Sequence, residues 1–341
     1  MKILVTGSSG FLGVEVVERL LEHGESDIRC FVRPGSRLEK LRALEERYPA
    51  AAIEYFTGNL TSARDAAEAI KGVRVVYHLA AAMAGSAADM FLNSVVASKN
   101  LLEAVSKRKT VKVVLVSSFG VYGVADRPAG SVVNERTPLE TRPEERDVYS
   151  YSKWRQEVLF RDYQREYGFP LVILRPGVIY GPGGAPLSSR VGVNIFGLYF
   201  HFGRSNLLPL SYVTNCAEAI VVAGSNPEAE GEVYNVHDDD LPTAHAYLQA
   251  YRRSVRRMPY ITIPYFVTQW ISRAVKAYHS HSKGQLPDVF TPYKSASAWK
   301  GNTFDNAKVK SIGWGQLVST REGMTRTFDH WHEAEPQARD A

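Results

Sequence analysis

The stretch Val5-Thr6-Gly7-Ser8-Ser9-Gly10-Phe11-Leu12-Gly13 sets the predicted architecture, because its three glycines stand three residues apart between a strand and a helix. Gly7 permits the tight turn out of the strand, Gly10 lets backbone N–H groups approach a diphosphate, and Gly13 lets the helix pack close to the sheet. The helix N-terminus then faces the anion with its partial positive charge. A glycine triplet alone is weak evidence, but in this position it predicts dinucleotide binding.

The rest of the first half alternates short β-branched runs with longer amphipathic stretches, which is typical of parallel strands joined by crossover helices. The predicted strands are Lys2–Thr6, Ile28–Val32, Ile53–Thr57, Val75–Leu79, Val111–Ser117 and Leu171–Arg175. The predicted helices cover about 11–23, 37–47, 62–71, 88–108 and 147–167. Six such strands after a glycine-rich turn predict an α/β fold, a Rossmann-type doubly wound parallel sheet.

The second half has no such period. A loop is marked by Gly181-Pro182-Gly183-Gly184, a helix is expected near Asn215, and a strand near Glu232–Val236. We therefore expect a nucleotide-binding domain over 1–180, to which 212–240 returns. Residues 181–211 and 241–332 are expected to form a smaller, irregular substrate lobe, and 333–341 a frayed tail.

Composition and charge exclude several classes of protein. The net charge of +5, from 41 basic and 36 acidic residues, is too small to indicate a nucleic-acid-binding protein. The cluster Arg252, Arg253, Arg256 and Arg257 fits a solvated helix face or a contact to a substrate phosphate. Cys30 and Cys216 are far apart and form neither a disulfide framework nor a zinc motif, which favours a reducing cytoplasm. No paired histidine or carboxylate spacing indicates a metal.

No membrane-spanning segment is expected. The chain passes from Met1-Lys2 directly into the first strand, which leaves no room for a signal peptide. The most apolar late stretch, Tyr260–Tyr278, is interrupted by Pro264, Arg273 and Lys276. A substrate-covering helix, a core helix and peripheral membrane contact all remain open for this stretch.

The residue at the end of the second predicted strand indicates the choice of dinucleotide. An acidic residue there binds both ribose hydroxyls and repels a 2′-phosphate. Arg33 does the reverse, with Ser36 and Arg37 near enough to help, so the sequence favours NADP(H) over NAD(H). A surface arginine that stacks on adenine is the alternative, and it leaves NAD possible.

The candidate catalytic residues are a tyrosine and a lysine one helical turn apart. Tyr149 and Lys153 stand at i and i+4, so they project from one face of the 147–167 helix. A phenol with a pKa near 10 is a poor proton shuttle at neutral pH, and a nearby ammonium stabilises the phenolate. The run Ser117-Ser118 at a strand end offers a hydroxyl to hold a substrate oxygen.

Together these features resemble the short-chain dehydrogenase/reductase superfamily, and within it the extended, epimerase/dehydratase-type branch. The resemblance covers about residues 1–240 well. The matching segments are the glycine turn, Gly58-Asn59-Leu60, His78-Leu79-Ala80-Ala81, Asn93, Ser117–Gly123, Tyr149/Lys153 and Leu174–Gly183. The later segments Phe304–Lys308 and Gly313-Trp314 resemble sterol dehydrogenase-type relatives.

The resemblance implies roles for individual residues. Tyr149 is implied to be the acid/base, Lys153 to lower its pKa and bind the ribose, Ser118 to polarise the carbonyl, and Asn93 to line the relay. Contacts to the cofactor are implied for Gly7, Gly10, Phe11, Leu12, Gly13, Asn59, Leu60, Leu79, Ala80, Ala81, Pro176 and Val178. His78 is expected to be a packed residue at a strand end.

Departures from the family pattern narrow the chemistry. Phe119-Gly120 stands where dehydratases carry an Asp-Glu pair, so elimination of water is not favoured. Decarboxylating relatives carry a glutamate in the same segment, and it is missing here as well. Nucleotide-sugar epimerases carry an arginine shortly before the segment matching Tyr212–Asn215, and here Leu207–Ser211 has none.

Three functions therefore stay open. The first is a net oxidoreductase acting at a secondary alcohol or ketone carbon. The second is an epimerase that recycles a tightly bound NAD, and the third is a non-catalytic NADP-sensing protein. The substrate can be a nucleotide sugar, a sterol-like ring or a smaller ketone. The resemblance also implies a homodimer formed through the 88–108 and 147–167 helices.

Overall fold

A seven-stranded parallel sheet organises the computed structural model, which describes residues 2–108, 110–281 and 291–339. The order of the strands across the sheet is β12-β7-β5-β4-β1-β2-β3. Their bounds are β1 (Ile3–Thr6), β2 (Asp27–Val32), β3 (Ala52–Thr57), β4 (Val75–His78), β5 (Lys112–Val116), β7 (Leu171–Pro176) and β12 (Val233–Val236). The predicted doubly wound fold is confirmed, and β12, the strand predicted near Glu232–Val236, adds a seventh strand to the six of the first half.

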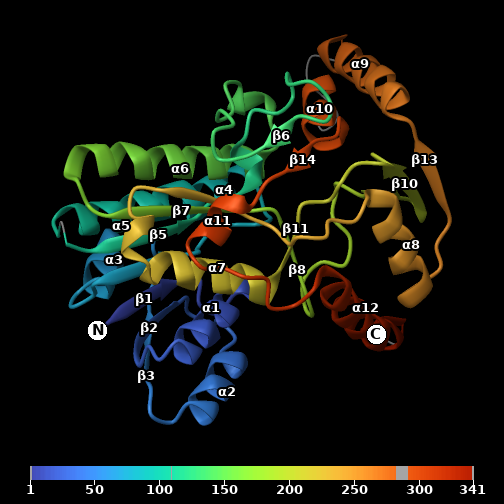
Figure 1. Ribbon diagram of the computed structural model, residues 1–341. Coiled ribbons are helices and arrows are strands. Elements are labelled where there is room, and N and C mark those ends of the chain that lie inside the picture. The colour runs from blue at the N-terminus through green and yellow to red at the C-terminus, as the bar shows by residue number, and fades with distance from the viewer. Residues whose placement is uncertain (1, 109, 282–290, 340–341) are drawn as a thin grey trace.

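Helices cover both faces of the sheet (Figure 1). One layer contains α1 (Phe11–Glu22), α2 (Glu39–Arg47) and α7 (Val213–Ser225), and the other contains α3 (Ala63–Ala69), α5 (Ala97–Ser106) and α6 (Val148–Tyr167). Successive residues of a strand point to opposite faces. In β1, accordingly, Ile3 and Val5 pack into the core with α1 and α7, whereas Leu4 packs into the core with α3 and α5.

The helix predicted over about 88–108 is present, but it contains a wider turn that the prediction did not include. The structure has α4 (Ala87–Phe91), a π-helical turn over Leu92–Val96, and then α5. Two serine side chains form hydrogen bonds here: the Ser98 hydroxyl donates to the Ser94 carbonyl oxygen (2.5 Å), and Ser94 Oγ accepts from the N–H of Ala82, which precedes the helix (3.1 Å). Hydrophobic periodicity cannot register one wider turn, because both flanking segments keep their helical period.

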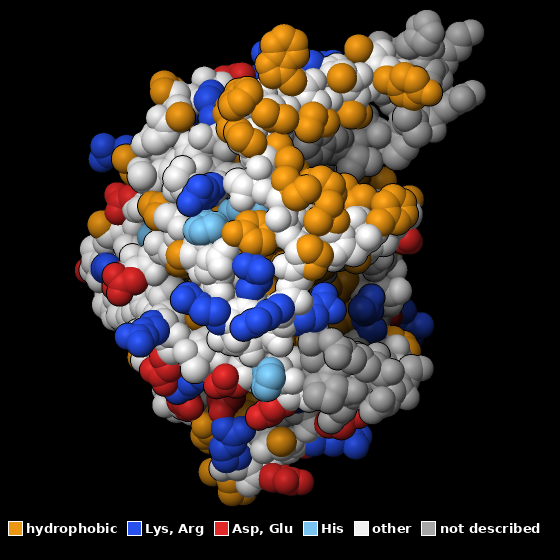
Figure 2. All heavy atoms as spheres, turned by 90° about the vertical axis from the view of Figure 1, so that its right-hand side faces the viewer, with side chains coloured by type: hydrophobic (Ala, Val, Ile, Leu, Met, Phe, Trp, Pro, Cys, Tyr) orange, Lys and Arg blue, Asp and Glu red, His pale blue; other side chains and the backbone are white. Residues whose placement is uncertain are grey.

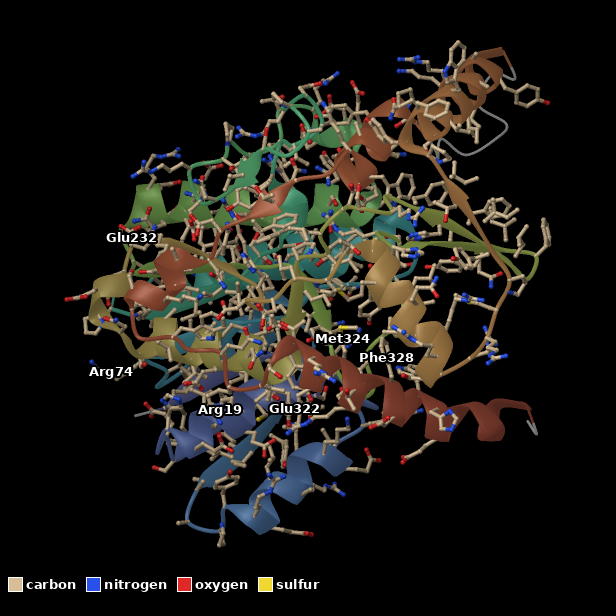
Figure 3. The ribbon with its side chains drawn as sticks, turned by 45° about the vertical axis from the view of Figure 1, so that its right-hand side comes forward. Arg19, Arg74, Glu232, Glu322, Met324 and Phe328 are labelled. Carbon is tan, nitrogen blue, oxygen red and sulfur yellow. The ribbon has the colours of Figure 1, made fainter. Side chains whose placement is uncertain are left out.

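The remaining segments build a smaller lobe beyond the carboxyl ends of the strands (Figure 1). Its elements are β8 (Val178–Tyr180), β9 (Gly192–Ile195), β10 (Leu198–Phe202), β11 (Leu210–Tyr212), α8 (Ala244–Ser254), β13 (Tyr260–Ile263), α9 (Tyr265–His281), α10 (Pro292–Trp299) and α12 (Thr320–Arg339). Shorter elements are β6 (Val132–Val133), β14 (Thr303–Phe304) and α11 (Ala307–Ser311). Met324 and Phe328 project from α12 toward α8 (Figure 3), where Phe328 packs edge-on against Tyr247 and Tyr251.

Two further expectations meet the structure here. The predicted frayed tail over 333–341 differs from the backbone, which is helical as far as Arg339, while 340–341 lie outside the described residues. Within the described part of the chain, no helix combines the length and apolarity needed to cross a bilayer. The division into a nucleotide-binding domain and a substrate lobe stays a prediction.

Candidate active site

A pocket of about 1020 Å³ opens at the carboxyl ends of the central strands and reaches under the second lobe. Ligands of doubly wound sheets bind at this edge, where the strand order reverses. Most of the predicted site residues line it, namely Gly7, Gly10, Phe11, Leu12, Gly13, Arg33, Asn59, Leu60, Leu79, Ala80, Ala81, Asn93, Ser118, Tyr149, Lys153 and Val178. Arg37 and Pro176 were predicted to contact the cofactor and do not line this pocket.

The glycine turn fits a dinucleotide diphosphate. Gly7 has φ 73°, and an added Cβ would lie 3.0 Å from the Ala80 nitrogen. A Cβ on Gly13 would lie 2.0 Å from the Gly7 carbonyl oxygen, so only glycine permits this approach of α1 to the turn. The N-cap of α1, Gly10, supplies no side-chain hydrogen bond to the first turn. The first N–H groups of the helix therefore remain available to an anion.

One end of the pocket is polar, and none of the described residues that line it is acidic. A side cavity of about 290 Å³ is lined by Arg33, Pro34, Gly35, Ser36 and Asn59. Arg33 is exposed, and its backbone N–H donates to Ser36 Oγ (3.1 Å). The side-chain amide oxygen of Asn59 accepts from the Thr61 N–H (3.1 Å). The NH₂ group of the same side chain therefore remains available to a ligand. This cavity has the size and charge to hold a phosphate group.

Ser118 and Tyr149 meet at the centre of the pocket. Ser117 also lines the pocket, but its hydroxyl is engaged, because it donates to Glu157 Oε2 (2.6 Å). Ser118 Oγ accepts from the Gly120 N–H (3.1 Å) at the start of a 3₁₀ turn. Burial raises the pKa of the Tyr149 phenol, and a hydrogen bond with Ser118 opposes that shift. Of the two serines, Ser118 is therefore the one placed to share a substrate oxygen with Tyr149.

Lys153 lies one turn further along α6 and is buried. Its Nζ donates to the Val116 carbonyl oxygen (2.7 Å) and to the Gln156 amide oxygen. Burial lowers the pKa of Lys153 to about 7, and the Glu157 carboxylate opposes that shift. The predicted action of Lys153 on the pKa of Tyr149 stays a prediction, because burial, Ser118 and Asp147 are the influences seen on that phenol.

A buried network of hydrogen-bonded polar side chains lies next to Lys153, and it was not predicted from the sequence. Gln156 Nε2 donates to Ser98 Oγ (2.8 Å), and the His78 ring bonds to Ser98 Oγ through Nε2 (2.9 Å) and to Thr6 Oγ1 through Nδ1 (2.8 Å). Burial, with Lys153 adding to it, lowers the pKa of His78 to about 3. His78 is a packed, neutral residue at the end of β4, as predicted. Gln156 was missed because a lone glutamine on a helix carries no sequence signal.

Asn93 lies at the pocket rim rather than in this network. Its Nδ2 donates to the Asp89 carbonyl oxygen (2.9 Å) within the helical segment, and the side chain is half-buried. It stands in the π-helical turn, a distortion that recurs at functional sites. Its implied role in a relay stays a prediction.

Helix α6 is fixed to the sheet by a buried ion pair. Arg175 on β7 donates to Glu157 through Nε (3.0 Å) and Nη2 (2.5 Å), and both side chains are buried. Arg161 reaches the same carboxylate from one turn further along (2.9 Å). Such a bidentate pair fixes orientation as well as distance. It therefore holds the register of the helix that carries Tyr149 and Lys153.

Arg190 contributes a positive charge from the second lobe. It lines the pocket beside Ser188 and Ser189, and within the described ranges its guanidinium has no hydrogen-bond or ion-pair partner. Burial lowers the pKa of Arg190 to about 10; the nearby Arg146 adds to the shift and Asp147 opposes it. Sequence reasoning missed Arg190, because a loop arginine after Pro186 belongs to no period or motif.

The charged neighbours of Arg190 are already occupied. Arg146 is paired with Glu140 (3.1 Å). The Asp147 carboxylate caps α6, where it accepts from the Ser150 N–H (2.9 Å) and hydroxyl (2.7 Å). Arg190 is therefore the cation of this group that a bound anion can satisfy.

Comparison with known proteins gives the family. Residues 3–236 match the model of the NAD dependent epimerase/dehydratase family. An uncharacterized UDP-glucose epimerase of Bacillus subtilis is 29% identical over 69% of this chain and 76% of its own. A 2-alkyl-3-oxoalkanoate reductase of Shewanella oneidensis is 27% identical over 94% of this chain and 84% of its own.

Two further matches span nearly the whole length. A decarboxylating sterol-4-alpha-carboxylate 3-dehydrogenase of Candida albicans is 26% identical over 97% of both chains. The solved structure of a UDP-glucose 4-epimerase of Thermus thermophilus in complex with NAD covers 98% of this chain and 100% of its own, with a TM-score of 0.71 and 22% identity. The similarity of that structure bears on the fold alone.

Proposed function

The chain belongs to the NAD dependent epimerase/dehydratase family, and on this premise we propose that it catalyses net hydride transfer between NADP(H) and a secondary alcohol or ketone that bears a carboxylate. Its relatives include both reductases and epimerases of the extended short-chain dehydrogenase/reductase type. The observation that carries the reaction is the meeting of Ser118, Tyr149 and Lys153 in the pocket that the glycine turn enters.

The chain's own residues supply the proton chemistry. When bound, the nicotinamide takes or gives a hydride at the carbinol carbon. Tyr149 accepts the proton of the substrate hydroxyl in oxidation and returns it in reduction, while Ser118 holds the same oxygen. Lys153, whose pKa burial lowers to about 7, would bind the ribose next to this centre. The glycine turn would hold the diphosphate.

NADP is the cofactor that the adenine end favours. Arg33 has no acidic partner within the cavity it lines, and that cavity holds no carboxylate to repel a 2′-phosphate. With NAD, Arg33 would have no phosphate to pair with and could only stack on the adenine ring. Net reduction also fits a cell's use of NADPH as reductant, whereas a recycling epimerase needs no second cofactor pool.

The carboxylate is inferred from Arg190. An arginine without a partner in a pocket satisfies its charge with an anionic ligand, and its planar fork matches a carboxylate. The names of the two oxidoreductase relatives, the 2-alkyl-3-oxoalkanoate reductase and the sterol-4-alpha-carboxylate 3-dehydrogenase, each describe a substrate with a carboxylate. In both substrates the reacting carbon 3 lies two bonds from the carboxylate carbon. We therefore propose a 2-substituted 3-hydroxy or 3-oxo acid as the substrate class.

A homodimer completes the proposal. The apolar side chains Phe91, Leu92 and Val148 are exposed on α4, the π-helical turn and α6, the region where relatives of this type associate. The two cysteines, Cys30 and Cys216, are buried and unpaired, which is compatible with a reducing cytoplasm. Gel filtration that gives a monomer at micromolar concentration would remove the dimer from the proposal.

The test is net turnover with a defined acid. Purified protein is mixed with NADPH and a 2-alkyl-3-oxo acid, and absorbance at 340 nm follows consumption of the reduced cofactor. We expect stoichiometric NADPH loss and a 3-hydroxy product. Interconversion of epimers with no net loss, together with NAD that co-purifies, would assign the epimerase function instead.

Arg190 is tested by comparing two substrates. In Arg190→Met we expect KM for the acid to rise about tenfold or more, as for loss of a charge-assisted contact, and KM for the methyl ester of the same acid to stay unchanged. An equal rise for acid and ester would overturn the carboxylate assignment while leaving the hydride-transfer proposal in place.

A further inference from the structure

Helix α9 turns its apolar side outward. Phe266 and Trp270 stand one turn apart and are 66% and 68% exposed, and Ile271 and Tyr278 are exposed as well. The side that packs on α10 carries instead the fully buried polar residues Thr268 and Ser272. Their hydroxyls donate to the carbonyl oxygens of Pro264, just before the helix, and of Gln269 within it. A surface helix of a water-soluble domain has the opposite arrangement, because burial of apolar area is what stabilises it.

The hairpin between β9 and β10 adds to the same surface. Phe196 at its tip is fully exposed and adopts φ 50°, a left-handed conformation that bulky residues rarely take. Asparagine, aspartate or glycine is favoured at such a turn position, so a phenylalanine there does not serve the turn. Ile195 beside it and Ile261 on β13 are also exposed, and β13 leads directly into α9.

Positive charge borders this apolar surface. Between Leu241 and His281 the sequence has no aspartate or glutamate, while it has Arg252, Arg253, Arg256, Arg257, Arg273 and Lys276. Arg253, Arg256, Arg257, Arg273 and Lys276 are exposed. Figure 2 shows hydrophobic side chains gathered over the upper part of this face with a row of Lys and Arg side chains beneath them.

We propose that the apolar side of α9 and the β9–β10 hairpin tip dock into the surface of a bilayer that contains anionic lipid. Aromatic side chains such as Phe266, Trp270 and Phe196 insert at the boundary between headgroups and acyl chains. The bordering arginines and Lys276 lie at headgroup level, where each contributes attraction to anionic lipid. The inward polar side of α9 remains on α10, so docking needs no rearrangement of the fold.

A second copy of the chain is a poorer occupant of this surface. A twofold contact places the same patch on both sides of the interface, so the acid-free, cationic segment of each copy would face that of the other. Like charges brought together at an interface oppose association. An anionic lipid surface has the complementary charge, and it is extended enough to cover both the helix and the hairpin.

The test is co-sedimentation of the full chain with vesicles, one set of phosphatidylcholine alone and one of equal parts phosphatidylcholine and phosphatidylglycerol. We expect binding to the anionic vesicles that weakens as salt is raised. The double variant Phe266→Ser/Trp270→Ser should weaken binding about tenfold or more, since it removes two inserted rings, and Arg253→Glu/Arg257→Glu should weaken it at low salt.

Matched controls use exposed residues elsewhere. Leu317→Ser removes an exposed apolar side chain and Arg64→Glu reverses an exposed charge on α3, and both should bind as the unmodified chain does. Turnover of a water-soluble substrate without vesicles should be unchanged in every variant. The proposal is overturned if the unmodified chain stays in the supernatant, or if Leu317→Ser impairs binding as much as the double variant. It is also overturned if the double variant only converts a dimer to a monomer.

Discussion

Replacing Arg33 with alanine should change which dinucleotide the protein prefers. A hydrogen bond between a charged donor and phosphate contributes about 1.5–3 kcal/mol, and about 1.4 kcal/mol corresponds to a factor of ten in affinity. Arg33 is exposed, so solvent and salt screen its charge, and the low end of that range applies. We therefore expect Kd for NADPH to rise about tenfold at physiological salt, with Kd for NADH unchanged.

The measurement is a fluorescence titration of each dinucleotide, at low and at physiological salt. Arg37→Ala is the matched control, because Arg37 is also exposed and basic but does not line the cavity. It should leave both affinities unchanged. If Arg33→Ala leaves the ratio of the two affinities as it was, or if Arg37→Ala alters it equally, the 2′-phosphate does not bind at Arg33.

Three further predictions concern the reaction, the turn and the buried network. Tyr149→Phe should lower kcat by about 10²–10⁴, the range for loss of general acid–base catalysis, with unaltered NADPH binding; undiminished turnover would exclude Tyr149 as the proton carrier. Gly13→Ala puts a Cβ 2.0 Å from the Gly7 carbonyl oxygen, so thermal melting should show a lower Tm and titration weaker NADPH binding; an unshifted melt would contradict the steric argument. His78 stays neutral when folded to a pKa of about 3 but protonates near 6.5 when unfolded, so acid destabilises the fold by about 1.4 kcal/mol per pH unit below 6.5. Urea unfolding at about pH 7.5 and pH 5 should show that loss, and His78→Asn should show a smaller one.

The parts of the fold that follow a strong period were predictable. The strands of the first half lie within one residue or so of their predicted ends, because buried parallel strands have apolar runs bounded by polar turns. The π-helical turn inside 88–108 was not predictable, because one wider turn leaves the apolar spacing of the flanking helical segments unaltered. The outward apolar side of α9 was equally hidden, because periodicity shows that a helix has two sides but not which one faces water.

The candidate site divides in the same way. Ser118, Tyr149, Lys153 and the glycine turn could be found because their chemistry demands fixed spacing within one strand or helix. Arg190 and Gln156 could not, because each acquires its place only when segments distant in sequence pack together. Arg37 was predicted from its closeness to Arg33 in the sequence and Pro176 from the resemblance, and neither residue lines the pocket, although their neighbours Ser36 and Gly177 do.

Helix α10 lies between the pocket and α9. One of its sides supplies Lys294, Ser297 and Ala298 to the pocket, and α9 lies against it from outside. These wall residues come late in the chain, after the strands and turns that grip the dinucleotide are complete. Substitutions in this part of α10 can therefore change which substrates bind while the residues for hydride transfer stay the same. New substrate specificities can then evolve without a change in the reaction.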